Sequence, residues 1–155
     1  MAIEREGRPY SQINFLVQIS DGPDARTDWR AGFQEVTGLS MEVTVAEYRN
    51  GNSLDNGTVK VNGGVKNENL TLKRGVGGDI RTLYAWLNDV RNGVQTPAHR
   101  ELTIMLLDET RTNPVQTWRL RGARPVKLSG PTFSAKGTDV AIEECVIAYE
   151  RMDVE

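Results

Sequence analysis

Few residues of this chain have the type and spacing that catalysis or metal binding requires. The 155 residues include one cysteine, Cys145, and one histidine, His99. A zinc site needs several such ligands, and a cysteine–histidine pair would require these two distant residues to meet. Cys145 also lies in an apolar strand pattern, where a buried thiol is common. We therefore expect neither a disulfide within the chain nor a metal site.

A glycine-rich turn before a helix is the second candidate for chemistry. Residues 74–78, RGVGG, follow a predicted strand and precede a predicted helix, which is the arrangement of a phosphate-binding loop. The Gly-Lys-Ser/Thr ending of a P-loop is missing, and Ile80 stands where the dinucleotide fingerprint has its third glycine. Asp79 at the helix start would repel an anion. The segment therefore reads as a tight strand-to-helix turn.

The acidic residues offer no catalytic pair. Glu143 and Glu144 are adjacent in a predicted strand, so their side chains point to opposite faces and cannot flank one bond. The chain also lacks a Gly-x-Ser-x-Gly nucleophile motif. We expect a protein that is not an enzyme and has no cofactor.

Charge and hydropathy limit the partners. With 19 basic and 21 acidic residues the net charge is −2, which gives no overall field for nucleic acid or an anionic membrane. No apolar run approaches the roughly 20 residues of a membrane span, and residues 1–10 have no hydrophobic segment behind them that could act as a signal peptide. We expect no specific nucleic-acid binding, no membrane insertion by the monomer, and synthesis in the cytoplasm.

Alternation of apolar and polar residues predicts a mainly β fold. Strands are expected over 13–19, 41–46, 70–73, 102–107, 115–121 and 140–149, with 124–128 extended. Apolar residues at helical spacing, with Asp79 as cap and Gly93 as stop, predict one helix over about 79–92. The expected architecture is two packed antiparallel sheets, a β-sandwich or barrel, with this helix on its flank. We expect one domain over 1–155, with an N-terminal arm at 1–12 and a β core at 13–150.

Three local details follow from the same pattern. Gly38, between two extended pieces, is expected where the chain turns or bulges, because glycine is free to adopt positive φ. In 140–149, the row Val140, Ile142, Val146 and Ala148 is expected to face inward. Glu144 interrupts that row, which predicts a β-bulge near it.

The segment from Met41 to Gly64 carries the clearest sign of a partner. In 41–46 a half-buried strand is expected, with Met41, Val43 and Val45 on its apolar face. Residues 49–64, rich in Asn and Gly, predict a long loop between strands, and loops of this length are usually functional or disordered. Docking on another chain would cover Leu54, Val59 and Val61, which otherwise have nothing to cover them.

The order of several short segments resembles the tail tube proteins of contractile phages and the inner tube proteins of contractile injection systems. These segments are GFQEVTGLS at 32–40, EYRNG at 47–51, LTLKRGV at 70–76, LYAW at 83–86, PVK at 125–127 and VAIE at 140–143. The resemblance runs from about Phe15 to Glu150. It departs at Arg124, where relatives more often carry an aromatic residue before the proline.

The resemblance implies a β-sandwich subunit that forms hexameric rings, which stack into a hollow rigid tube inside a contractile sheath. Sheath contraction drives this tube through the target envelope, and the lumen conducts a cargo effector, a tape-measure protein or DNA. Implied partners are further copies of the chain, the sheath protein, and baseplate and hub proteins. Candidate contacts between subunits or rings are Arg8, Tyr10, Arg49, Asn50, Asn52, Leu54, Val59 and Val61. Candidate lumen-facing residues are Glu42, Thr44 and Ala46.

Two other classes of protein stay open on the residues alone. One is a monomeric β-sandwich that binds a carbohydrate or a protein through the 49–64 loop. The other is an enzyme with a carboxylate site, which the search for catalytic residues disfavours. The sequence also leaves open whether the particle is a phage tail, an extracellular injection system or a cell-anchored one.

Overall fold

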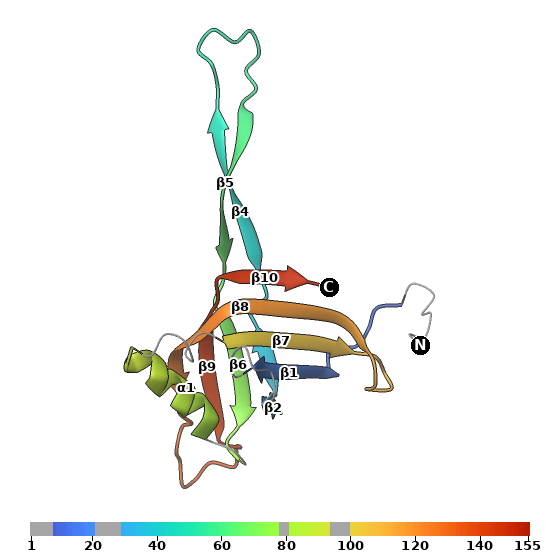
Figure 1. Cartoon of the computed structure of the whole chain (residues 1–155), viewed down its shortest axis with the longest axis vertical. Coiled ribbons are helices and arrows are strands. Elements are labelled where there is room, and N and C mark those ends of the chain that lie inside the picture. Colours follow the sequence, from blue (N-terminus) through green and yellow to red (C-terminus); the bar gives the residue numbers. More distant parts are fainter. Residues whose placement is uncertain (1–7, 21–28, 78–80, 94–99) are drawn as a thin grey trace.

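The computed structural model describes residues 8–20, 29–77, 81–93 and 100–155. Within these residues the chain is mainly β, with one helix (Figure 1). The elements in chain order are β1 Phe15–Ser20, β2 Trp29–Ala31, β3 Glu35–Thr37, β4 Met41–Tyr48, β5 Val59–Asn67, β6 Leu70–Gly75, α1 Arg81–Arg91, β7 Arg100–Leu107, β8 Pro114–Ser129, β9 Ile142–Ala148 and β10 Arg151–Val154. The predicted fold class is confirmed.

Strand β8 joins two antiparallel sheets. On one side the order is β2-β1-β7-β8, with β10 also paired to β8, and on the other it is β8-β9-β6-β3. The first part of β8 pairs with β7, and Arg124 to Ser129 pair with β9. A register shift near Gly122 marks the passage between the two sheets, and such a bulge bends a strand. The two extended pieces expected at 115–121 and 124–128 are therefore one strand.

The core lies where the inward rows of both sheets meet the helix. Alternate residues of four strands are buried, because neighbouring side chains of a strand point to opposite faces. Helix α1 packs beside β8 and covers this cluster with Leu83 and Trp86. The cluster consists of Val17, Ile19, Phe33, Leu70, Leu72, Leu83, Trp86, Leu102, Ile104, Leu120, Ala123, Cys145, Ile147 and Tyr149.

The inward face of β9 is opposite to the one expected. Cys145 and Ile147 are fully buried, whereas Val140 is 75% exposed and Ile142 is 37% exposed. The predicted bulge near Glu144 is also wrong, because β9 runs in unbroken register with β6. The prediction of the inward face is wrong because Glu143 lies on the buried face, where Arg74 of β6 neutralises its charge. A hydropathy pattern counts that glutamate as an outward residue.

The helix and the turn expected at Gly38 agree with the sequence prediction. The helix spans Arg81–Arg91 against the predicted 79–92, and its expected cap, Asp79, lies outside the described residues. Arg100 of β7 holds the helix by its guanidinium, 5.3 Å from the centroid of the Trp86 ring and 4.0 Å from the Asp89 carboxylate. Gly38 has a φ of 94°, the positive value that glycine adopts most easily.

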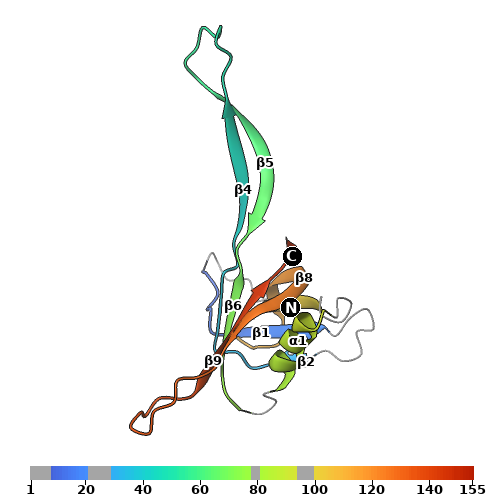
Figure 2. The same ribbon diagram turned by 90° about the vertical axis from the view of Figure 1, so that its left-hand side faces the viewer.

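The largest departure from expectation is a hairpin. Strands β4 and β5 pair with each other and form a sheet of their own, which projects from the body (Figures 1 and 2). Strand β5 begins at Val59, so residues 59–64 belong to a strand and the loop spans only 49–58. The prediction of a loop over 49–64 is therefore wrong for residues 59–64. In this segment Val59 and Val61 alternate with polar residues, and the segment pairs with β4.

Candidate assembly surfaces

The β4–β5 hairpin is exposed on both faces. Every residue of β4 is exposed, and so are all of β5 except Asn67. The expectation that 41–46 is half buried is wrong for this chain alone, since Met41 is 55% and Val43 46% exposed. Monomeric proteins rarely display so many apolar groups together. The hairpin thus has the character of a surface that another molecule covers.

The base of the hairpin is fixed to the body by two hydrogen bonds. The Tyr149 hydroxyl donates to the carbonyl oxygen of Ser40 at 3.2 Å, and Asn67 Nδ2 donates to the carbonyl oxygen of Glu150 at 3.2 Å. Burial, with a smaller effect of the Glu68 carboxylate, raises the pKa of Tyr149, so this hydroxyl keeps its proton. The hairpin direction is therefore set by the β9–β10 turn.

The loop at the end of the hairpin is ordered by its own polar groups. Arg49 donates from Nε to the carbonyl oxygen of Asp55 and from Nη2 to that of Ser53, both at 3.3 Å. The Tyr48 hydroxyl donates to Asn50 Oδ1 at 2.7 Å. Leu54 lies at the surface, fully exposed. Arg49 and Asn50 thus shape the loop, whereas Leu54 is free to meet a partner.

The other candidate residues fall in two places. Glu42, Thr44 and Ala46 are all exposed on β4, with Ala46 opposite Val61 of β5. From the N-terminal segment, Tyr10 lines a groove of about 640 Å³, while Arg8 is exposed. Asn52 is exposed in the hairpin loop. The groove is lined by Tyr10, Gln12, Ile13, Phe15, Gln34, Glu35, Val36, Thr37, Leu39, Ile104, Leu106 and Trp118.

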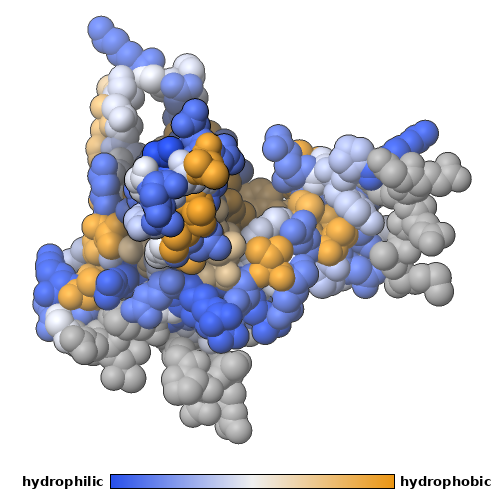
Figure 3. Space-filling view, turned by 90° about the horizontal axis from the view of Figure 1, so that it is seen from above, coloured by the Kyte–Doolittle hydropathy of each residue, from blue (hydrophilic) through white to orange (hydrophobic). Residues whose placement is uncertain are grey.

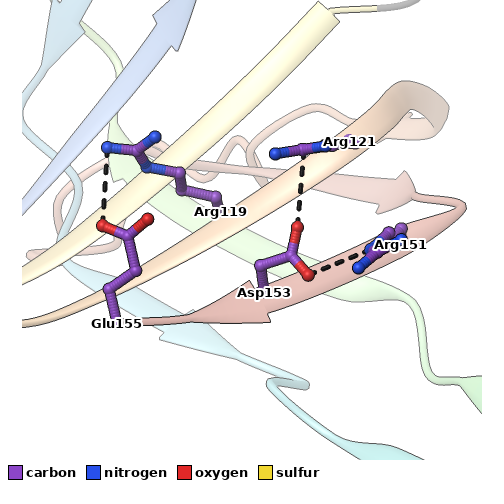
Figure 4. A network of polar contacts seen from close by, with 5 residues as sticks. All are labelled: Arg119, Arg121, Arg151, Asp153 and Glu155. Atoms are coloured by element: carbon purple, nitrogen blue, oxygen red, sulfur yellow. Dashed lines mark hydrogen bonds and ion pairs between the residues drawn. The ribbon is translucent and has the colours of Figure 1, made fainter.

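A row of ion pairs joins β10 to β8 at the surface (Figure 4). Arg119 lies 3.5 Å from the Glu155 carboxylate, and Asp153 lies 3.4 Å from Arg121 and 3.0 Å from Arg151. These side chains are exposed, apart from Asp153 at 29%, so each pair contributes little to stability. Three arginines thus share two carboxylates in this row.

Two of the described groups that could do chemistry, Cys145 and Glu143, are buried. Burial, and then the nearby Glu143, raises the pKa of the Cys145 thiol to about 12, so it stays protonated and unreactive. Glu143 itself forms a buried ion pair with Arg74. Residues 8–20, 29–77, 81–93 and 100–155 contain no cluster of three potential metal ligands. His99 lies outside the described residues.

Sequence reasoning missed several exposed apolar residues of the hairpin. Tyr48 is 60% and Val65 59% exposed, and neither was among the candidates. The available signal was the Gly63-Gly64 pair after the alternating Val59 and Val61, because glycine inside a strand pattern points to a bulge and not to a loop.

The chain is a mainly β protein whose β4–β5 hairpin forms a sheet of its own and is exposed on both faces. Residues 11–153 match the family described as the T4-like virus tail tube protein gp19, and this chain belongs to that family.

Solved structures agree with this assignment. A chain of the sheath–tube complex of an extracellular contractile injection system, PVC, in the extended state is similar with a TM-score of 0.81 and 25% identity, over 97% of this chain and 93% of that one. A chain of the anti-feeding prophage (AFP) baseplate is similar with a TM-score of 0.82 and 26% identity, over 96% of each chain. A type six secretion system protein is similar in fold, with a TM-score of 0.52 and 12% identity, over 90% of this chain and 82% of that one. No curated protein matches the chain. The chain is thus a structural inner tube subunit.

Among the described residues, no helix has the length and apolarity that crossing a membrane requires.

Proposed function

We propose that this tube subunit assembles into hexameric rings that stack into a hollow, rigid tube. The observation that carries the proposal is the β4–β5 hairpin, exposed on both faces and ordered to its end. Covering its apolar side chains releases water, which favours association by about 25 cal/mol per Å² of apolar surface buried. Contacts that are heterologous between identical subunits generate closed rings when the rotation allows it.

The proposed partners are those of a contractile particle. The similar chains come from a PVC sheath–tube complex and an AFP baseplate, which supports a sheath protein and baseplate and hub proteins as neighbours of this tube. Sheath contraction drives the tube through the target envelope. The lumen conducts a cargo effector, a tape-measure protein or DNA, without a specific nucleic-acid site. Glu42, Thr44 and Ala46 are proposed to face that lumen.

The role proposed here is structural and requires no catalysis. Stiffness comes from backbone hydrogen bonds and apolar contacts, because a closed assembly leaves few strand edges unpaired. All 155 residues serve as one tube domain, with residues 1–12 as an arm that contacts a neighbouring copy. The finished tube belongs to an assembled particle, either a phage tail or an injection system.

Electron microscopy of two purified proteins tests the proposal. One is the full chain, and in the other residues 42–66 are replaced by a short turn. The full chain is expected to form rings and tubes, and the shortened one to remain a folded monomer because the hairpin contributes no side chain to the core. Circular dichroism checks the fold. Tubes formed by the shortened chain would contradict the proposed role of the hairpin.

A further inference from the structure

Four asparagines of this chain are followed by glycine, and this pair of residues has a chemistry of its own. They are Asn50, Asn56, Asn62 and Asn92. Because glycine has no side chain to hinder its backbone nitrogen, that nitrogen can attack the side-chain amide carbon of the asparagine before it. The reaction releases ammonia and converts the asparagine into an acid. The way in which the structure holds each pair therefore decides which asparagine reacts.

Three of the four pairs are held in place by the fold. The Gly57 N–H donates a hydrogen bond to Asp55 Oδ1 at 3.2 Å, and the Gly93 N–H donates to a carbonyl oxygen of helix α1 at 3.1 Å. Asn62 is paired with strand β4, so its backbone is extended. Each of these pairs must break a contact of the fold before the glycine nitrogen reaches the amide carbon.

The pair Asn50-Gly51 has no such restraint on its glycine. Within the described part of the chain, the Gly51 N–H donates to no acceptor, and a side chain at Gly51 would meet no atom within 4 Å. Both residues are exposed. In the view from above, the end of the hairpin faces the viewer, and no other described part of the chain covers it (Figure 3). The Gly51 nitrogen can therefore turn toward the amide, and water can reach it.

Tyr48 supplies a group that favours this attack. Its hydroxyl donates to Asn50 Oδ1 at 2.7 Å, and this oxygen gains negative charge when the Gly51 nitrogen attacks Cγ. A donor that points at such an oxygen stabilises the charge in the transition state. Arg49 binds two carbonyl oxygens of the same loop, which keeps the loop ordered around the amide. The loop thus combines an unrestrained nucleophile with a positioned donor.

We infer that Asn50 is a site of spontaneous deamidation and that the Tyr48 hydroxyl promotes the reaction. The Gly51 nitrogen forms a bond to Asn50 Cγ, the Cγ–Nδ2 bond breaks, and Nδ2 leaves as ammonia with the proton of the Gly51 nitrogen. Water then opens the succinimide ring at either carbonyl, which gives aspartate or isoaspartate at position 50. The inference goes beyond the proposed function, because it concerns the chemistry of the single chain and not its assembly.

The modification changes the end of the hairpin in two ways. It adds one carboxylate to a chain whose net charge is −2, in a loop that already contains Asp55. Isoaspartate also adds one atom to the backbone, so the turn that the Ser53 N–H closes by donating to the Asn50 carbonyl oxygen at 3.1 Å loses its geometry. Copies of the chain therefore acquire, with age, a loop of different charge and shape.

Peptide mass spectrometry of the purified full chain measures the reaction at all four asparagines. The folded chain is kept in a mildly alkaline buffer, which removes the proton of the attacking nitrogen more readily, and samples are taken over several days. We expect Asn50 to deamidate about tenfold faster than Asn56, Asn62 or Asn92, a difference of about 1.4 kcal/mol in the barrier. In the chain unfolded by urea, where the fold no longer distinguishes the sites, the four rates should converge.

Tyr48→Phe separates the effect of the hydroxyl from the effect of exposure. The variant keeps the ring but removes the donor, so deamidation at Asn50 should slow roughly two- to tenfold, the range that one such hydrogen bond allows. Tyr84→Phe is the matched control, because Tyr84 is an exposed tyrosine of the helix, and it should leave the rate unchanged. Gly51→Ala has room for its Cβ and should also slow the reaction, because the Cβ hinders the nitrogen.

Two results would overturn the inference. Deamidation of Asn50 in the folded chain at the rate of Asn56 or Asn92 would show that the fold does not select this site. Deamidation that is unchanged or faster in the Tyr48→Phe variant would show that the hydroxyl does not promote the reaction. Circular dichroism checks that each variant is folded.

Discussion

The buried Arg74–Glu143 pair is the residue-scale feature with the clearest energetic consequence. Both residues are nearly fully buried and face each other across β6 and β9. Removing one charge from such a pair leaves the other without compensation in a medium of low polarity. The pair thus allows a glutamate on the inward face of β9, and it explains why hydropathy alone gave the wrong face.

Glu143→Gln should destabilise the protein by about 3–5 kcal/mol, because Arg74 then remains buried without its carboxylate. Glu35→Gln is the matched control, since Glu35 lies 3.8 Å from Lys73 in an exposed pair whose loss costs less than about 1 kcal/mol. Urea unfolding measures both values. Similar losses for the two variants would refute the special role of the buried pair.

Asp108 makes stability depend on pH. Its carboxylate accepts hydrogen bonds from the Thr110 hydroxyl at 2.8 Å and from the Thr112 backbone N–H at 3.1 Å, and these bonds hold the pKa of Asp108 below its ordinary value of 3.8. The stabilisation is therefore complete above pH 3.8 and is lost as the pH falls through the lower pKa of the folded state.

We expect Asp108→Asn to unfold at a lower urea concentration than the wild type near neutral pH. The difference should shrink at a pH well below 3.8, because the wild-type residue is then protonated too. Unfolding curves of both proteins across this pH range measure the effect. A difference that stays constant with pH would show that hydrogen bonding to the charged carboxylate is not its cause.

At the scale of elements, Gly38 controls the junction between β3 and the hairpin. Its φ is 94°, and a Cβ there would lie 2.3 Å from the carbonyl oxygen of Asn69. Gly38→Ala should therefore destabilise the protein by about 1–3 kcal/mol, which is the range for a strained backbone conformation.

Gly32→Ala is the control for this substitution, because a Cβ at Gly32 meets nothing within 4 Å. Thermal unfolding of both variants makes the comparison. Equal melting temperatures would mean that the Gly38 junction relaxes without cost, which contradicts the strain expected there.

Strands were predictable where one face meets the protein's own core. Val17 and Ile19 of β1 and Leu70 and Leu72 of β6 are buried as their alternation indicates. The hairpin was not predictable in the same way, because its apolar rows are uncovered in the single chain. The Asn and Gly content of 49–64 is typical of a loop, and only the pairing with β4 shows that 59–64 continues as a strand.

At the scale of the whole molecule, the chain consists of a body with a self-sufficient core and a hairpin without one. The body contains the two sheets that share β8, and the hairpin leaves it at one end (Figure 1). Family membership and the resemblance of its short segments were available from the sequence. The pairing of the hairpin was not, since its register shifts between Val43 and Val45 through a β-bulge that the alternation does not locate.

Electron microscopy of the purified full chain tests the central claim most directly. The account predicts hollow tubes built from stacked rings, with sixfold symmetry in end-on views. A folded chain that remains monomeric at every concentration tested, without rings or tubes, would contradict it.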